Sequence, residues 1–182
     1  PKSKRDNHPT FGDLYIQKQI EFQTEMFFSL YNHQHIPVTV HRFTKYGFTL
    51  QSDGEDQEIP KTDVKFCYKA EDAEKVKETI CYSEEIRAQK MGAVVPRKER
   101  YQIDTQEILR ARKDRSPIEV TIREGEVFRG CADWVSPYEI KMILENGSKI
   151  IVFRHAVHDL KVCSRGDETV EENSTEESDT QG

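Results

Sequence analysis

Several residue patterns that mark membrane, secreted and metal-binding proteins are missing from this sequence. None of the four cysteines forms a Cys-x-x-Cys pair or another metal-ligand spacing (Cys67, Cys81, Cys131 and Cys163). We interpret them as small apolar residues of a protein in a reducing, cytoplasmic compartment. No segment approaches 18 consecutive apolar residues, and residues 1–5 are followed by no apolar stretch. We therefore expect neither a membrane span nor a secretion signal.

Signatures of catalysis are also lacking. The chain has no phosphate-binding loop, no nucleophile elbow and no recognisable acid–base pair of carboxylates, so we expect no enzyme activity and no cofactor. Three histidines lie close in sequence, and they leave a metal-dependent enzyme open as an alternative (His33, His35 and His41). His155 and His158 are expected to point to opposite faces of a strand, which argues against a joint metal site. We assign no metal ligands.

Hydrophobic residues are few for a compact globule. They make up 35% of the 182 residues, whereas charged residues make up 33%. Either much of the chain is surface and tail, or a partner chain completes the core. A ring of small barrels fits the second option, and a plain domain with disordered ends fits the first. The length allows one ordinary domain or two small ones.

The net charge of −6 is unevenly distributed. Residues 165–182 hold seven acidic residues and one basic residue, which leaves 26 of the 27 basic and 26 of the 33 acidic residues in the body. The body is therefore neutral, and it can bind nucleic acid only if its cations cluster on one face. The acidic tail is expected to be disordered and to compete with RNA for Arg112, Lys113 and Arg115, with a role in solubility alone as the alternative.

Hydrophobic periodicity and turn residues predict the order of elements. Residues 13–33 are expected to be helical because apolar residues recur there at helical spacing. Alternation predicts strands at 36–43, 46–52, 57–60 and 64–68, followed by a helix at 71–89. Asp104 resembles a helix cap, with a short helix to residue 114. Further strands are expected at 118–122, 127–135, 139–144, 149–156 and 157–163.

The two halves share a weak internal echo. Gln-Thr-Glu-Met at 23–26 and Val-Thr-Val at 38–40 recur as Thr-Gln-Glu-Ile at 105–108 and Val-Thr-Ile at 120–122. We interpret the first half as a degenerate copy that lacks the second strand, with coincidence as the alternative. The predicted divisions are a flexible arm (1–12), a first copy (13–70), a helical connector and linker (71–96), a second copy (97–164) and the acidic tail (165–182).

The segment from Arg112 to Leu160 resembles the Hfq family of Sm-like RNA chaperones. The resemblance depends on a basic run at 112–115, on Pro117, Gly125, Gly130 and Tyr138, and on Phe-Arg-His-Ala-Val at 153–157, which is similar to the family's Tyr-Lys-His-Ala-Ile signature. It covers about a third of the chain. It implies a mainly β (α+β) fold of small bent Sm-like barrels, each preceded by a helix, with two in tandem. It also implies a homo-oligomeric ring, either a trimer of tandem modules or a hexamer.

The resemblance implies an RNA site as well. Tyr138 would stack on a base, His155 would hydrogen-bond the base, and Arg154 would take the place of the family's lysine. A second contact would be the basic rim at the end of the short helix (Arg112, Lys113 and Arg115). The implied function is binding of single-stranded, uridine-rich RNA in post-transcriptional regulation.

Other interpretations of these residues stay open. Tyr138 can cover a barrel end, His155 can be a core histidine bonded to backbone, and the basic rim can be a solvated helix end. Thr121 replaces the aromatic residue of the family's second RNA face, and Thr62 replaces the histidine in the first copy, which therefore has a structural role. The alternative function is a ring that scaffolds other proteins without binding RNA.

Overall fold

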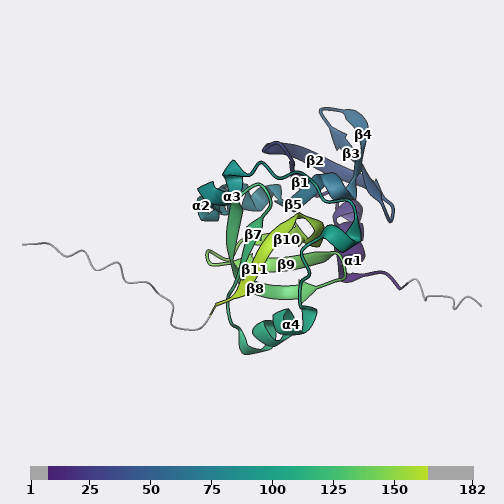
Figure 1. Cartoon of the computed structure of the whole chain (residues 1–182). Helices are drawn as coiled ribbons and strands as arrows, with labels where there is room; N and C mark the ends of the chain where they lie inside the picture. The colour runs from purple at the N-terminus through teal and green to yellow at the C-terminus, as the bar shows by residue number, and fades with distance from the viewer. Residues whose placement is uncertain (1–7, 164–182) are drawn as a thin grey trace, which may run out of the picture.

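A computed structural model describes residues 8–163 of the protein (Figure 1). Most of the expected flexible arm and the whole acidic tail, residues 165–182, lie outside the described residues. The prediction of a mainly β protein is confirmed: a helix is followed by strands that pair antiparallel in one sheet. Within the described range, no helix combines the length and apolar character needed to cross a membrane.

The elements fall into two similar series joined by a connector. The first module contains α1 (Phe11–Glu21), β1 (Glu25–Leu30), β2 (Gln34–Phe43), β3 (Gly47–Ser52), β4 (Glu55–Pro60), the 3₁₀ turn η1 (Lys61–Asp63) and β5 (Val64–Lys69). The second module contains α4 (Thr105–Asp114), β7 (Ile118–Ile122), β8 (Glu126–Val135), β9 (Glu139–Leu144), β10 (Lys149–Phe153), η4 (Arg154–Ala156) and β11 (Val157–Val162). Each module is thus a helix and five strands, with a 3₁₀ turn before the last strand.

The sheet repeats the same strand order in both modules. Along the sheet the order is β11-β7-β8-β9-β10-β5-β1-β2-β3-β4, so each module runs from its last strand through its first to its fourth. The modules are joined where β10 pairs antiparallel with β5, with Ile151 opposite Cys67 and Val152 opposite Phe66. This pairing leaves β4 and β11 as the two ends of the sheet.

Register shifts recur at matching places in the two modules. The β2–β3 pairing shifts between Val40 and Arg42, and the β8–β9 pairing shifts between Ala132 and Trp134. Both modules also show a shift where the first and last strands pair. Such irregularities bend strands and increase their twist, which lets a small sheet curve strongly.

The prediction of a helix over residues 13–33 is confirmed up to Glu21 and is wrong for the residues that follow. Thr10 caps α1 in a capping box with Asp13, and the helix ends at Glu21 before Gln23 takes a positive φ of 49°. Residues 25–30 form β1, with Met26 and Phe28 buried on one face. The first module therefore has all five strands, and the predicted loss of one strand is incorrect. Segment 23–26 matches no part of α4, so that portion of the internal echo is coincidental.

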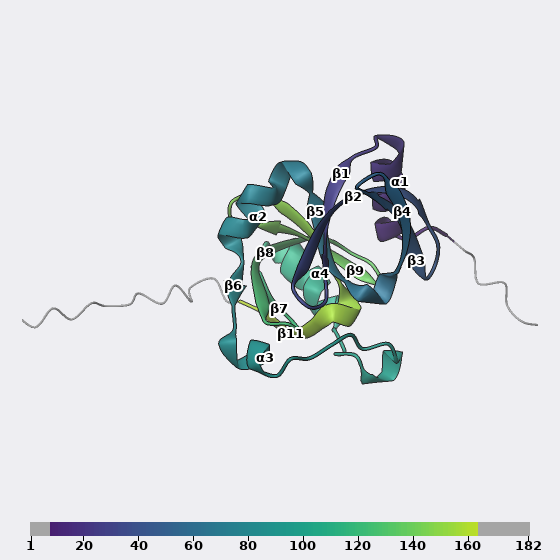
Figure 2. The same ribbon diagram turned by 90° about the horizontal axis from the view of Figure 1, so that it is seen from above.

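Two other predicted elements are corrected by the structure. The helix expected over 71–89 is divided into η2 (Ala70–Asp72), α2 (Ala73–Thr79), the two-residue strand β6 (Cys81–Tyr82) and α3 (Glu84–Ala88). β6 pairs with the start of β8, so the residues of β6 are extended and interrupt the predicted helix. The strand expected over 149–156 ends at Phe153, because residues 154–156 form the 3₁₀ turn. The connector continues along the outside of the second module to η3 (Arg97–Glu99) (Figure 2).

Each module contributes side chains to the core of the other. The core of the second module includes Phe66 and Tyr68 of β5, and Phe66 contacts Phe128 edge-on at 4.8 Å between ring centroids. The core of the first module includes Ile151 and Phe153 of β10. Alternate residues of paired strands face opposite sides of a sheet, so the β10–β5 junction supplies both cores at once.

Candidate nucleic-acid interface

Three of the six residues predicted for RNA binding, those assigned to the base site, lie in one small pocket. Tyr138, Arg154 and His155 line a cavity of about 110 Å³. The rest of its lining comes from the turn before β9 and from the connector (Pro137, Arg97, Arg100, Tyr101, Gln102 and Ile103). The residues that the sequence resemblance assigns to one base site are therefore also neighbours in the fold.

A hydrogen-bonded turn holds Tyr138 at the mouth of the pocket. The Ser136 hydroxyl accepts hydrogen bonds from the backbone N–H groups of Tyr138 and Glu139, at 3.1 and 2.9 Å. The Tyr138 carbonyl in turn accepts the N–H of Arg154 at 2.8 Å, which ties the tyrosine turn to η4. The tyrosine side chain is 40% exposed, so one part of its ring packs and the rest stays open to a ligand.

His155 forms a wall of the pocket rather than an open donor. Its side chain is 7% exposed, and Nε2 lies 2.8 Å from the carbonyl oxygen of Val64 in the first module. Burial lowers the pKa of His155 to about 4, although the hydrogen bond to Val64 acts in the opposite direction. The imidazole is therefore neutral at physiological pH, and Nε2–H donates to Val64. The direct contact of His155 with a base stays a prediction.

Arg154 lies beside the pocket and forms no ion pair with a carboxylate of the described part of the chain. Its Nη1 and Nη2 donate to the carbonyl oxygens of Ser136 and Ile103, at 2.9 and 3.2 Å. Burial lowers the pKa of Arg154, and the negative charge of Glu139 partly offsets this effect. A guanidinium group with a pKa lowered from 12.5 is still protonated at neutral pH.

Sequence reasoning missed two arginines of the connector. The Arg97 guanidinium lies 5.7 Å from the centroid of the Tyr138 ring, and Arg100 donates to the carbonyl oxygens of Val94 and Val95, at 3.0 and 2.7 Å. The only signal for them was the combination of cations and an aromatic residue at 97–101. The helical connector and linker were predicted to end at residue 96, and nothing local in sequence shows that the next residues fold back onto Tyr138.

The pocket is positively charged. No aspartate or glutamate is among the residues that line it. Across residues 8–163, the arginines found in ion pairs are Arg42, Arg87 and Arg129, none of which belongs to the pocket. Arg97, Arg100 and Arg154 therefore concentrate positive charge in a body whose overall charge is neutral.

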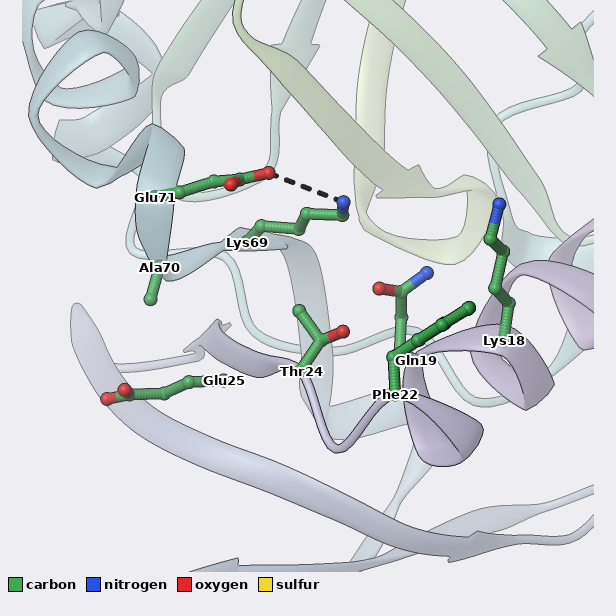
Figure 3. A pocket seen from close by; sticks show the side chains of 8 residues that line it. All are labelled: Lys18, Gln19, Phe22, Thr24, Glu25, Lys69, Ala70 and Glu71. Atoms are coloured by element: carbon green, nitrogen blue, oxygen red, sulfur yellow. Dashed lines mark hydrogen bonds and ion pairs between the residues drawn. The ribbon is translucent and has the colours of Figure 1, made fainter.

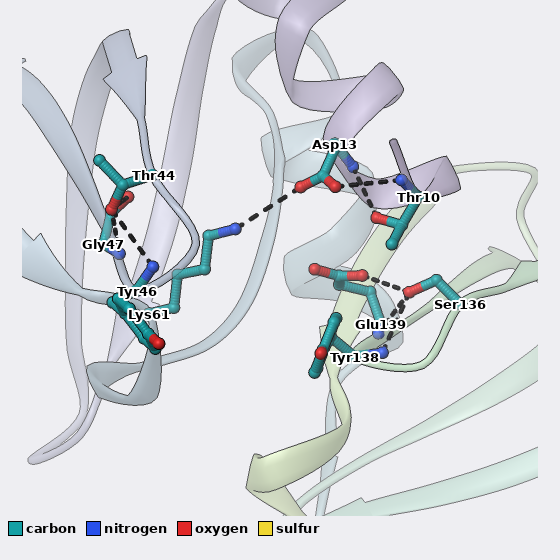
Figure 4. A network of polar contacts seen from close by, with 9 residues as sticks. All are labelled: Thr10, Asp13, Thr44, Tyr46, Gly47, Lys61, Ser136, Tyr138 and Glu139. Carbon is teal, nitrogen blue, oxygen red and sulfur yellow. Dashed lines mark hydrogen bonds and ion pairs between the residues drawn. The ribbon is translucent and has the colours of Figure 1, made fainter. Parts of the chain in front are cut away.

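The first module repeats the tyrosine turn with a different cation beside it (Figure 4). Thr44 accepts the N–H groups of Tyr46 and Gly47, and the Tyr46 carbonyl accepts the Lys61 N–H at 2.8 Å. Tyr46 is 75% exposed. The Lys61 ammonium group, however, lies 3.7 Å from Asp13 and over the rings of two phenylalanines. Its charge is already paired, so this turn offers a weaker site for an anion.

The rim residues form a separate surface. Arg112, Lys113 and Arg115 are exposed at the C-terminal end of α4, where Arg115 takes a left-handed φ of 54°. Cations at a helix C-terminus interact favourably with its dipole, so their position also has a structural explanation. None of them lines the Tyr138 pocket.

A larger cavity of about 490 Å³ lies between the end of α1 and the end of β5 (Figure 3). Its lining combines Lys18 and Lys69 with Glu25 and Glu71, and Lys69 is paired with Glu71 at 3.3 Å. It includes none of the residues predicted for RNA binding. Mixed charge makes it a poorer match for a polyanion than the smaller pocket, in spite of its size.

The three neighbouring histidines do not form a metal site together. His41 pairs with Asp56 at 3.2 Å, and His35 contacts the ring of Phe66. His33 lies near two carboxylates, those of Glu124 and Glu126. The ammonium group of Lys65 is already hydrogen-bonded to both carboxylates, so a lysine supplies the cation that they require.

Comparisons with family models, with curated proteins and with solved structures gave no match to this chain. The Tyr138 pocket contains the three residues that the sequence resemblance assigns to the base site, together with Arg97 and Arg100.

Proposed function

We propose that this protein binds single-stranded RNA at the Tyr138 pocket and acts in post-transcriptional regulation, without catalysis. In this proposal the two modules are Sm-like barrels of the Hfq type. Two features support it: each module is a helix followed by five antiparallel strands, and the Phe-Arg-His-Ala-Val run at 153–157 forms the turn and strand start beside Tyr138. A base would stack on Tyr138, and arginines would contact phosphate.

The observation that carries the proposal is a partly exposed aromatic ring beside arginines that form no ion pair within residues 8–163. Tyr138 is partly exposed, Arg97 contacts its ring, and Arg154 is bonded to its turn. Aromatic faces stack on any base, and guanidinium groups bind phosphate through paired N–H donors. A tyrosine that only covers a barrel end would need no cluster of arginines around it.

Replacement of Tyr138 by alanine should weaken binding of a short uridine-rich RNA by about 1–3 kcal/mol, the contribution of one stacked base. Fluorescence anisotropy titration of the full chain measures this change. Tyr46→Ala is the matched control, because Tyr46 occupies the same kind of turn but its neighbour Lys61 is paired with Asp13. Equal losses for both variants, or none for Tyr138→Ala, would show that this pocket is not the RNA site.

We also propose that chains assemble head to tail into a ring. β4 and β11 end the sheet, and inside each chain the equivalent strands, β10 and β5, already pair. An unpaired edge strand tends to pair with another chain unless it is protected. Matching the 3₁₀ turns of the two modules places Ile59 of one chain opposite Asp159 of the next. The exposed part of β4 is acidic, whereas β11 carries the exposed Lys161, whose ammonium group lies 3.4 Å from Asp159 of the same strand.

Native mass spectrometry at micromolar concentration should detect a closed oligomer, a trimer if both modules take part. Lys161→Glu should shift the equilibrium toward monomer, since it places an acid opposite the acidic β4 edge. Lys75→Glu makes the same charge change on α2, away from both edge strands, and should leave assembly unchanged. A monomeric parent would refute the ring. An oligomer that binds no RNA at any salt concentration would favour the scaffold function instead.

A further inference from the structure

We infer that the Tyr138 pocket recognises the end of a nucleic-acid strand, with a terminal phosphate monoester bound by Arg97, Arg100 and Arg154 and the adjoining base on Tyr138. This inference rests on the proposed RNA binding and narrows its ligand. The shared chemistry is a terminal phosphate, at either the 5′ or the 3′ end.

Charge is the first argument. A phosphate monoester carries about −1.5 to −2 charges near neutral pH, whereas an internal phosphodiester carries one. Three guanidinium groups line the pocket and no carboxylate does. Glu139, a buried acid whose charge acts on Arg154, accepts a hydrogen bond from the Ser136 hydroxyl and lies against Gly12 of α1, outside the lining. Three cations match a doubly charged end group better than a single internal phosphate.

The arrangement of donors is the second argument. Arg100 and Arg154 are anchored by carbonyl oxygens, which fix the position of a guanidinium group without neutralising its charge. Arg100 uses Nε and Nη2 in these bonds, and Arg154 uses Nη1 and Nη2, so each retains N–H donors. Anchored guanidinium groups with spare donors are suited to the oxygens of a phosphate group.

Size is the third argument. The cavity of about 110 Å³ is smaller than the roughly 300–1,000 Å³ of pockets that enclose drug-sized ligands, so it suits a compact phosphate group better than a whole nucleotide. Tyr101, Gln102 and Ile103 of the connector contribute to its walls, together with Pro137 and the buried ring of His155. The base of the terminal nucleotide would remain at the mouth, where Tyr138 is exposed.

The test uses the full chain and three oligouridylates of equal length, with a 5′ phosphate, with a 3′ phosphate, or with neither. Isothermal titration calorimetry should show about tenfold tighter binding for one phosphorylated oligonucleotide than for the unphosphorylated one, and the preferred form identifies the end. Arg97→Gln should reduce this preference to less than about threefold. Lys98→Gln is the matched control: it removes one positive charge at the next residue, which does not line the pocket, and should retain the preference.

The possible results distinguish a failure of end recognition from a failure of RNA binding itself. Equal affinity for all three oligonucleotides would overturn end recognition and leave RNA binding standing. No measurable affinity for any of them would overturn both. A preference that survives Arg97→Gln as fully as Lys98→Gln would overturn the assignment of the terminal phosphate to the connector arginine.

Discussion

Replacing Lys65 by methionine should lower the free energy of unfolding by about 3–5 kcal/mol at neutral pH, the cost of removing one partner from a buried ion pair. Lys65 is 0% exposed, and its ammonium group is hydrogen-bonded to Glu124 at 2.5 Å and to Glu126. The two glutamates belong to the second module and Lys65 to β5 of the first. Methionine would retain the length of the side chain but leave two buried carboxylates without a cation.

Urea denaturation at pH 7 measures this loss. Lys69→Met is the control, because Lys69 is a half-exposed residue of the same strand whose pair with Glu71 should contribute less than about 1 kcal/mol. The double variant Lys65→Met with Glu126→Gln should recover part of the stability, because it removes one of the two carboxylate charges that Lys65→Met leaves without its lysine. Equal effects of Lys65→Met and Lys69→Met would contradict a stabilising role for the buried network.

The same network has a defined pH dependence. Burial raises the pKa of Glu124, but the hydrogen bond and charge of Lys65, with the N–H groups of Asn32 and His33, hold it below its ordinary value. A lowered folded-state pKa contributes stability that is present above the unfolded value and is lost as pH falls through the folded value. The difference between the parent and Lys65→Met should therefore shrink as pH falls through the lowered pKa of Glu124, where its carboxylate becomes protonated.

Acidification from pH 7 to pH 4 should remove about 3 kcal/mol of stability through His155 alone. Its pKa is lowered from 6.5 to about 4, chiefly by burial, and each unit of difference corresponds to about 1.4 kcal/mol. The unfolded chain binds a proton at this histidine between those two values while the folded protein does not. The contribution is thus complete above about pH 6.5 and is lost progressively down to about pH 4.

His155→Gln should flatten this part of the stability profile, because the glutamine amide can donate to the Val64 carbonyl without taking up a proton. Urea midpoints measured from pH 4 to pH 7.5 test this expectation. His158→Gln, a substitution on β11 outside the pocket, should leave the slope close to that of the parent. A slope that His155→Gln does not change would show that other groups cause the acid sensitivity.

The second module was largely predictable from sequence, and the missed strand in the first has a physical cause. β7 and β8 alternate between buried and half-buried residues, so a period of two is visible in the sequence. In β1, however, Phe27 packs against the core of the second module while Phe28 lies in the core of the first. A strand covered on both faces shows a continuous apolar run, which cannot be distinguished from a buried helix by periodicity.

Long-range pairings explain the remaining gaps in the predicted site. The resemblance identified Tyr138, Arg154 and His155, and the fold places them in one pocket. Arg97 and Arg100 reach that pocket only through the path of the connector, which has no periodic pattern of its own. Lys65 likewise gives no local signal, because a lysine in a strand normally indicates an exposed position, and its partners lie 59 and 61 residues away.

The junction between β10 and β5 also affects how the protein is made. β5 ends at Lys69 and β10 begins at Lys149, so at about 5–20 residues per second a ribosome needs about 4–16 s to supply the partner strand. During that interval the nascent chain exposes the edge of β5 and the rings of Phe66 and Tyr68, whose core is not yet complete. Neighbouring nascent chains on one polysome expose the same unpaired edge of β5, and such edges can pair with each other. Slow translation of residues 70–148 should therefore increase aggregation, and co-expressed chaperones that bind apolar segments should reduce it.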